Sequence, residues 1–256
     1  MSTASQSLRP YIVFENVSKS FDDLRVLDGV SFQAMPAETL CIIGRSGVGK
    51  SVTLQLIMGF LRPDSGKIFI DGDDITQFSE EQMKAVRRKV TMVFQGGALF
   101  DSLTVAENVA FPLRERGELM EDQIEQIAHG LLGMVGTTHL EQMLPSDLST
   151  GMKRAVAIAR ALAAQPEAVL YDEPTTMVDP RMAHHLGRLM QKVKQQLKLT
   201  SVVVTHDMRF AEALADRVLF LHEAKARFFG TLEEMHQCQD PDLRQFLQAD
   251  LVDIPV

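Results

Sequence analysis

The sequence lacks the features that mark disulfide-bonded, membrane-spanning and secreted proteins. Only two of its 256 residues are cysteines, Cys41 and Cys238, and they form no C-x-x-C pair. This pattern excludes a metal site framed by cysteines and fits a reducing cytosol. The longest apolar run has five residues (155–159), whereas a membrane-spanning helix needs about 20. Because the polar start (residues 1–10) also lacks the basic stretch and apolar core of a secretory signal, we expect a cytosolic protein without a spanning segment.

Basic residues are too few for a broad nucleic-acid-binding face. The chain has 26 Lys and Arg against 34 Asp and Glu, a net charge of −8, so we expect no nucleic-acid partner. Apolar residues make up 45% and charged residues 23%, which is ordinary for a globular protein and excludes disorder as the main state. The length fits one large domain or one domain plus a subdomain.

The first part of the chain has the residue pattern of an antiparallel β region. Short segments with alternating apolar residues occur at residues 11–18, 25–27 and 30–33, and period 2 with brief turns is typical of such strands. Residues 67–70, followed by an Asp71-Gly72 turn, predict a further edge strand.

The second half predicts helices alternating with short buried strands, the pattern of a parallel sheet. Between the two halves, residues 103–148 have a mostly helical sequence pattern, which predicts an inserted helical subdomain. The expected strands are 168–172, 201–205 and 218–221, and the expected helices are 152–164, 180–197 and 209–215.

The strongest motif is a phosphate-binding loop. Residues 44–51 fit G-x-x-x-x-G-K-[ST] at every fixed position, between an apolar strand (39–43) and a helix. Glycines let successive N–H groups turn toward phosphate oxygens, and the following helix adds its positive end. Lys50 is expected to reach the β- and γ-phosphates and Ser51 to bind Mg²⁺. The nucleotide-binding residues predicted here are Gly44, Arg45, Ser46, Gly47, Val48, Gly49, Lys50, Ser51 and Val52.

The apolar strand 168–172 ends in two carboxylates, Asp172 as its last residue and Glu173 directly after it. Asp172 is placed to hold Mg²⁺, and Glu173 to accept a proton from an attacking water. A solvated turn is the alternative, but downstream of a phosphate loop the pair indicates nucleotide hydrolysis. GTPases commonly read guanine with N-K-x-D, whereas both asparagines here, Asn16 and Asn108, precede valine. This argues against a GTPase of that kind.

A third motif resembles the signature of ATP-binding cassette (ABC) proteins, usually L-S-G-G. Residues 148–152 read Leu-Ser-Thr-Gly-Met before a helix, and Asp172 comes 23 residues after Ser149. The remaining family pattern is then matched by Gln95 (the Q-loop glutamine), Asp179 (the D-loop aspartate), His206 (the switch histidine) and Phe21 (the aromatic residue that stacks on adenine).

The resemblance implies an α/β P-loop NTPase fold with a mixed-sheet core, an antiparallel β subdomain and a helical subdomain at about 96–165. It implies a homodimer that sandwiches two ATP molecules and Mg²⁺, with Gln95 sensing the metal and His206 helping to position the water. The signature residues that would face the partner's ATP are Ser149, Thr150, Gly151 and Met152. Thr150 departs from the usual glycine, and we expect it to adopt an ordinary negative φ.

Several segments are similar to the cassette ATPases of the Mla and Mce systems, which move phospholipid between membranes of Gram-negative bacteria or chloroplasts. They are residues 51–54, residues 94–105, Met152 and residues 241–247. The resemblance implies a motor held on the inner membrane by integral permease subunits, with a small regulatory subunit and a lipid carrier as further candidate partners.

A soluble ABC-type ATPase of DNA repair or of translation is the alternative. The absence of sustained heptads, cysteine clusters and a second phosphate loop argues against both. We expect residues 1–230 to form the ATPase domain. Residues 231–256 form a C-terminal extension, either a partner-binding element or a packed appendix.

Overall fold

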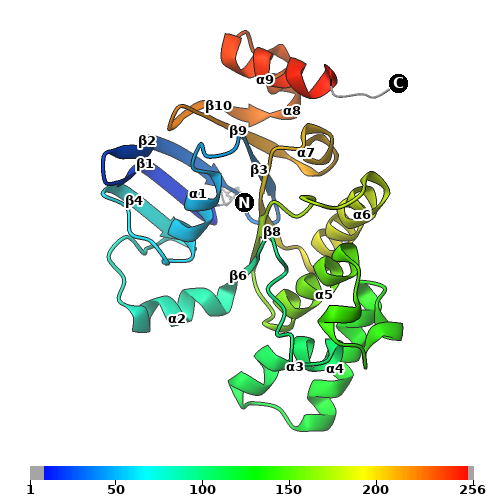
Figure 1. Ribbon diagram of the computed structural model, residues 1–256. Coiled ribbons are helices and arrows are strands. Elements are labelled where there is room, and N and C mark those ends of the chain that lie inside the picture. Colours follow the sequence, from blue (N-terminus) through cyan, green and yellow to red (C-terminus); the bar gives the residue numbers. More distant parts are fainter. Residues whose placement is uncertain (1–8, 253–256) are drawn as a thin grey trace, which may run out of the picture.

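The computed structural model describes residues 9–252 and contains two β-sheets (Figure 1). The first is antiparallel, with strand order β2-β1-β4-β5. It therefore confirms the antiparallel β region that the sequence predicts. Its strands are β1 (Ile12–Phe21), β2 (Leu24–Ala34), β4 (Ser65–Ile70) and β5 (Asp73–Asp74).

Two predictions for this sheet were wrong. Residues 25–27 and 30–33 belong to one strand, β2, because a bulge near Gly29 (φ 62°) absorbs an extra residue without ending the strand. The bulge breaks the alternation of apolar residues, so the sequence reads as two pieces. Strand β4 is also not an edge strand, since the turn after Ile70 brings β5 alongside it.

The second sheet has six strands in the order β10-β9-β3-β8-β7-β6, all parallel except the antiparallel pair β9–β10. It confirms the mixed core sheet and places the strands of the second half within one or two residues of their predicted bounds. The strands are β3 (Thr39–Ile43), β6 (Val90–Val93), β7 (Ala168–Asp172), β8 (Thr200–Thr205), β9 (Arg217–His222) and β10 (Lys225–Thr231).

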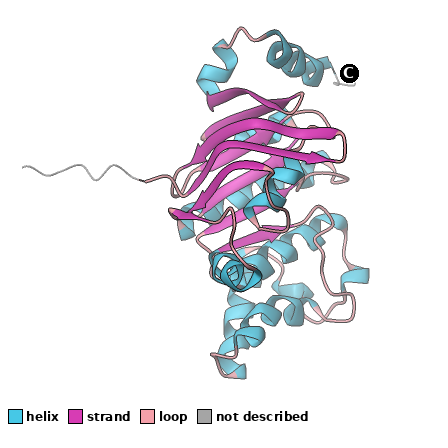
Figure 2. Cartoon of the chain, turned by 90° about the vertical axis from the view of Figure 1, so that its left-hand side faces the viewer, coloured by secondary structure: helices cyan, strands magenta, loops and turns pink. Residues whose placement is uncertain are grey.

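The six-stranded sheet separates two hydrophobic cores, because successive side chains of a strand point to opposite faces. Cys41 and Ile43 of β3 pack into the core shared with helices α3 to α7, whereas Leu40 and Ile42 pack toward the antiparallel sheet. Both cysteines are free, and burial raises the pKa of the Cys41 thiol to about 12. Figure 2 shows the strands stacked in one part of the molecule with most helices below them.

A helical part lies at one end of the molecule, as the sequence predicts for residues 103–148. It contains α3 (Val105–Arg116), α4 (Glu121–Met134) and the 3₁₀ turns η1 (Thr138–Leu140) and η2 (Pro145–Asp147). The other helices before the C-terminal region are α1 (Lys50–Ile57), α2 (Glu80–Lys89), α5 (Thr150–Ala163), α6 (Pro180–Leu197) and α7 (Met208–Leu214).

The C-terminal extension forms two helices, α8 (Leu232–Gln237) and α9 (Pro241–Val252). Met235 and Leu243 are buried, and the Phe246 ring lies 5.2 Å from that of Phe220 in β9. As far as it is described, the extension is therefore packed on the core sheet. Within residues 9–252 no helix has the length and apolar character to cross a bilayer. The predictions for residues 1–8 and 253–256 lie outside the described residues.

Candidate functional site

The phosphate-binding loop connects the buried strand β3 to helix α1. A Cβ on Gly44 (φ 150°) would lie 2.4 Å from the Leu221 carbonyl oxygen, so the close approach of strand β9 requires glycine there. Gly49 (φ 100°) is the N-cap of α1 and provides no side-chain cap. The first N–H groups of the helix therefore remain available to a phosphate oxygen.

Lys50 lies inside this loop with only 5% of its surface exposed. Its ammonium donates hydrogen bonds to the carbonyl oxygens of Gly44 (2.8 Å) and Arg45 (3.1 Å). The same nitrogen is 3.4 Å from Glu173 Oε1. The cation is thus held at the mouth of the loop, between the nucleotide-binding backbone and a carboxylate at the end of β7.

Ser51 and Asp172 form an oxygen pair below the loop, although 121 residues separate them. The Ser51 hydroxyl donates a 2.8 Å hydrogen bond to Asp172 Oδ1. Burial raises the pKa of Asp172, while the bond from Ser51 opposes the shift. Hydroxyl and carboxylate oxygens are ligands that Mg²⁺ accepts, usually together with substrate phosphates and water. Among residues 9–252, no group of three or more acidic, His or Cys side chains is placed to hold a metal ion. The donor chemistry of the Ser51–Asp172 pair itself fits a metal that phosphates share.

Glu173 occupies the turn that follows β7, in the left-handed backbone region (φ 46°). Its Oε2 lies 2.8 Å from His206 Nδ1, and its Oε1 faces Lys50. The Thr176 hydroxyl donates a 3.4 Å hydrogen bond to Oε2. Two basic groups and a hydroxyl therefore fix the carboxylate in one orientation, as a group that activates water requires.

A cavity of about 460 Å³ brings residues of five predicted motifs together. Phe21 lies at the end of β1 with 41% of its surface exposed, which leaves a ring face for a planar base. Gln95 follows β6, and its exposed side chain lines the same cavity. The predicted site residues that line it are Phe21, Ser46, Gly47, Gly49, Lys50, Ser51, Val52, Gln95, Glu173 and His206.

The signature residues 149–152 do not line this cavity. Ser149 is the exposed N-cap of α5, and its hydroxyl accepts a hydrogen bond from the Met152 N–H. Gly151 is buried against α6, where a Cβ would lie 2.3 Å from Met182 Cγ. Asp179 is also outside the cavity and caps α6 by accepting a bond from the Met182 N–H. Within one chain, the signature residues and Asp179 therefore lie apart from the cavity that Lys50 and Glu173 line.

Thr150 is the first residue of α5 and has no positive φ, as the sequence analysis expected. The β-branched side chain thus needs no strained backbone at this position. Thr150→Gly should change the ATPase rate by less than about threefold and lower the melting temperature slightly, since glycine is a weak helix former. Steady-state ATPase and thermal melting check this, and a hundredfold gain in rate would contradict it.

Three residues of the site region were missed by the sequence analysis. Val26 of β2 and Thr176 line the cavity, and no local pattern marks either of them. Arg154 is buried in α5 and contacts backbone near Gln95 and near Glu173. The sequence offered one signal for Arg154: it directly precedes the apolar run 155–159, which indicates that its cation is buried.

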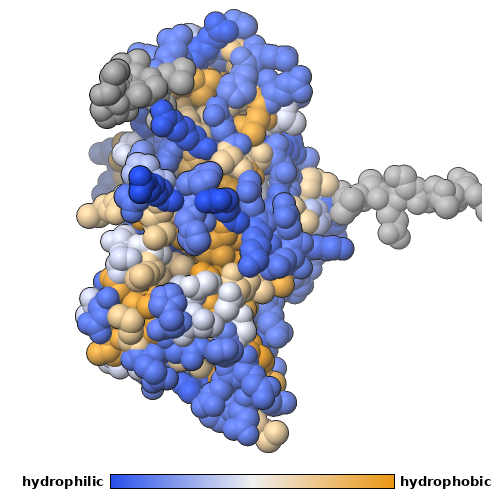
Figure 3. Space-filling model, turned by 90° about the vertical axis from the view of Figure 1, so that its right-hand side faces the viewer, coloured by the Kyte–Doolittle hydropathy of each residue, from blue (hydrophilic) through white to orange (hydrophobic). Residues whose placement is uncertain are grey.

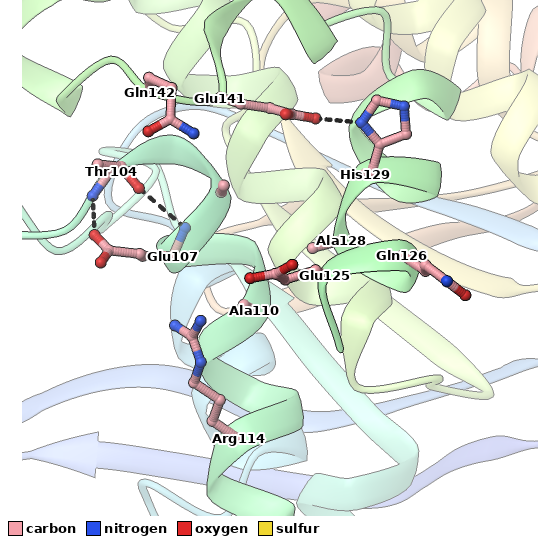
Figure 4. Close-up of a pocket in the computed structure, with 11 residues that line it drawn as sticks. Thr104, Glu107, Ala110, Arg114, Glu125, Gln126, Ala128, His129, Glu141 and Gln142 are labelled. Atoms are coloured by element: carbon pink, nitrogen blue, oxygen red, sulfur yellow. Dashed lines mark hydrogen bonds and ion pairs between the residues drawn. The ribbon is translucent and has the colours of Figure 1, made fainter. Parts of the chain in front are cut away.

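A second cavity, of about 640 Å³, lies in the helical part between α3 and α4 (Figure 4). At the edge of this cavity, His129 Nδ1 lies 2.6 Å from Glu141 Oε1. Arg114 points toward the cavity from α3. Thr104 and Glu107 form the capping box that starts α3. None of the predicted nucleotide-site residues lines this cavity.

Comparison with known proteins identifies the family. The sequence profile of the family described as "ABC transporter" matches residues 27–176, more than half of the chain. The chain belongs to the ABC transporter family. This ABC transporter ATPase binds ATP, hydrolyses it and acts as the motor subunit of a transporter.

Two relatives and one solved structure illustrate the range of this ABC family. The intermembrane phospholipid transport system ATP-binding protein MlaF of Haemophilus influenzae is 37% identical over 93% of this chain and 90% of its own. The methionine import ATP-binding protein MetN 2 of Rhodococcus jostii is 39% identical over 97% and 74%. The cassette MJ0796, a dimer in a post-hydrolysis state with ADP and Pi, superposes with a TM-score of 0.79, at 30% identity over 86% and 98%.

Proposed function

We propose that this ATPase drives a permease that moves phospholipid between bacterial membranes. The observation that carries the proposal is the similarity to MlaF over 93% of the chain, with the resemblance of residues 94–105 and Met152 to lipid-transport cassettes. The methionine-import relative has a similar identity, so methionine is the competing substrate.

The proposed motor is a homodimer with two ATP molecules at its interface. Support comes from the separation of the signature residues from the cavity that holds Lys50 and Glu173, and from the dimeric state of the MJ0796 structure. Ser149 stands exposed at the start of α5, where a hydroxyl and a helix N-terminus can donate to a γ-phosphate. A second copy would bring these donors to the phosphate loop.

Within each half-site the proposed roles follow from the contacts. Lys50 and the N–H groups of α1 bind the phosphates, and Phe21 stacks on the base. Glu173 accepts a proton from the attacking water while His206 holds its Oε2 and contacts the γ-phosphate. Ser51, Asp172 and Gln95 would hold Mg²⁺, which neutralises phosphate charge when bound.

The proposed division of the chain is an ATPase domain (1–230) with a helical subdomain (about 96–165), and an extension (231–256). We place the permease contact on the helical subdomain, because the cavity between α3 and α4 opens there and the loop after β6 links it to Gln95. Figure 3 shows that hydrophobic residues lie in the middle part of one face and mostly hydrophilic residues at its lower end, so the proposed permease contact rests on the cavity and the loop after β6. This contact would hold the ATPase at the cytoplasmic side of the inner membrane.

Purification of the tagged chain from detergent-solubilised membranes tests the proposal. We expect an integral permease to copurify and mass spectrometry to find phospholipid enriched over the bulk lipid of a control purification with an unrelated tagged protein. A small regulatory subunit and a lipid carrier are further expected components. Recovery without a permease, or a complex that binds radiolabelled methionine and enriches no lipid, would contradict the proposal.

A further inference from the structure

Helix α5 carries two arginines that are turned into the protein without an anionic partner. Arg154 is only 4% exposed, and Arg160 is partly buried. Their hydrogen bonds go to backbone carbonyl oxygens, and neither forms an ion pair with a described carboxylate. Burial lowers the pKa of both guanidiniums. Burying a cation without an anion costs free energy. The Phe100 ring, 5.6 Å from the Arg160 guanidinium, offsets part of this cost for Arg160. Among the described residues Arg154 has no such ring contact, so its position indicates a role other than stability.

Both arginines hold the loop that carries Gln95 (the Gln95 loop, residues 94–98). Arg154 Nη1 donates a 3.4 Å hydrogen bond to the Phe94 carbonyl, directly before Gln95. Arg160 donates to the carbonyls of Gly97 (3.2 Å) and Ala98 (2.8 Å), directly after it. Helix α5, which begins with the signature motif, is therefore hydrogen-bonded to the loop on both sides of Gln95.

Arg154 makes a second contact that Arg160 lacks. Its Nη2 donates a 3.5 Å hydrogen bond to the carbonyl of Thr176, whose hydroxyl donates to Glu173 Oε2. One guanidinium thus bridges the Gln95 loop and the turn that carries Glu173 (the Glu173 turn, residues 173–176). Arg154 Nε is buried without a hydrogen-bond partner, which costs free energy. The side chain therefore makes the bridge although one of its own donors stays unsatisfied.

We propose that Arg154 is a positioning residue for ATP hydrolysis, which fixes the Gln95 loop and the Glu173 turn against the signature helix. The proposal rests on the roles proposed above for Gln95 and Glu173. Arg154 does not line the nucleotide cavity, so it should set the rate of turnover and leave ATP binding unchanged. A misplacement of catalytic groups by about 1 Å costs on the order of 100-fold in rate.

Arg154→Met tests this, because methionine fills a similar volume without charge or donors. We expect kcat to fall about 10- to 100-fold, the ATP dissociation constant to stay within threefold, and the melting temperature to stay equal or rise, since apolar residues often stabilise a site vacated by a buried ion. Arg154→Lys should recover part of kcat. A merely structural arginine would lower the melting temperature and leave kcat per folded site unchanged, which would overturn the proposal.

Two further variants complete the test. Lys153→Met removes a neighbouring charge on α5 that makes none of these contacts, and its kcat should match the wild type. In a Gln95→Ala background, Arg154→Met should cost less than it does alone, because the part of its effect that acts through the Gln95 loop is already lost and only the part that acts through the Glu173 turn remains. Independent, multiplicative losses would overturn the proposal for Arg154 alone, whereas a fully active Gln95→Ala would overturn the role of Gln95 and the proposal together.

Discussion

Glu173→Gln should bind ATP and hydrolyse it about 100- to 10,000-fold more slowly than the wild type, the range for losing a general base. Glutamine keeps the shape of the side chain, but it accepts no proton from water. It also keeps an oxygen for the neighbouring Thr176 hydroxyl, so the fold should be preserved. Phosphate-release kinetics measure the rate, and equilibrium binding of a fluorescent ATP analogue shows that the site is still formed.

Glu167→Gln is the matched control for this change. Glu167 lies just before β7 at the opposite end of the strand from Glu173, and its side chain is half exposed beside Lys89. Its variant should retain full turnover. Normal turnover in Glu173→Gln would show that another group activates the water and would remove Glu173 from the proposed mechanism.

Lys50→Ala should weaken ATP binding by at least about 100-fold. Hydrogen bonds to charged groups contribute about 1.5–3 kcal/mol each, and Lys50 is placed to offer phosphate oxygens more than one. The loss should appear in the binding constant itself, because Lys50 sits in the loop that receives the nucleotide before any chemistry. Isothermal titration calorimetry with ATP measures it directly.

Lys67→Ala provides the control for the loss of a lysine. Lys67 lies on β4 with its side chain mostly exposed, and its nearest acidic partner, Asp74, is 3.9 Å away. ATP affinity should not change in this variant. An affinity of Lys50→Ala within threefold of the wild type would contradict the assignment of residues 44–51 as the phosphate site.

Local patterns made the nucleotide-binding elements predictable. The glycines of residues 44–51 follow a buried strand, Asp172 and Glu173 stand at the end of another, and parallel strands end at one edge of a sheet. The approach of Ser51 to Asp172 therefore follows from adjacent motifs despite 121 intervening residues. The N-cap role of Ser149 and the helical backbone of Thr150 likewise depend on only a few neighbouring residues.

Contacts that depend on tertiary packing were not predictable from the sequence. The bulge near Gly29 keeps β2 continuous although its apolar pattern shifts phase. The bond from Thr176 to Glu173 depends on a turn in which Glu173 has a positive φ. The bridge by Arg154 joins segments that are 60 and 22 residues away along the chain, and no spacing rule connects them.

The central claim is that a complete ATP site needs the signature residues of a second chain. Sedimentation velocity of Glu173→Gln with and without ATP and Mg²⁺ tests it most directly. We expect monomer without nucleotide and dimer with ATP, and the double variant Ser149→Arg/Glu173→Gln should bind ATP yet remain monomeric. A Glu173→Gln chain that stays monomeric with ATP bound, or a dimer that persists in the double variant, would contradict the account.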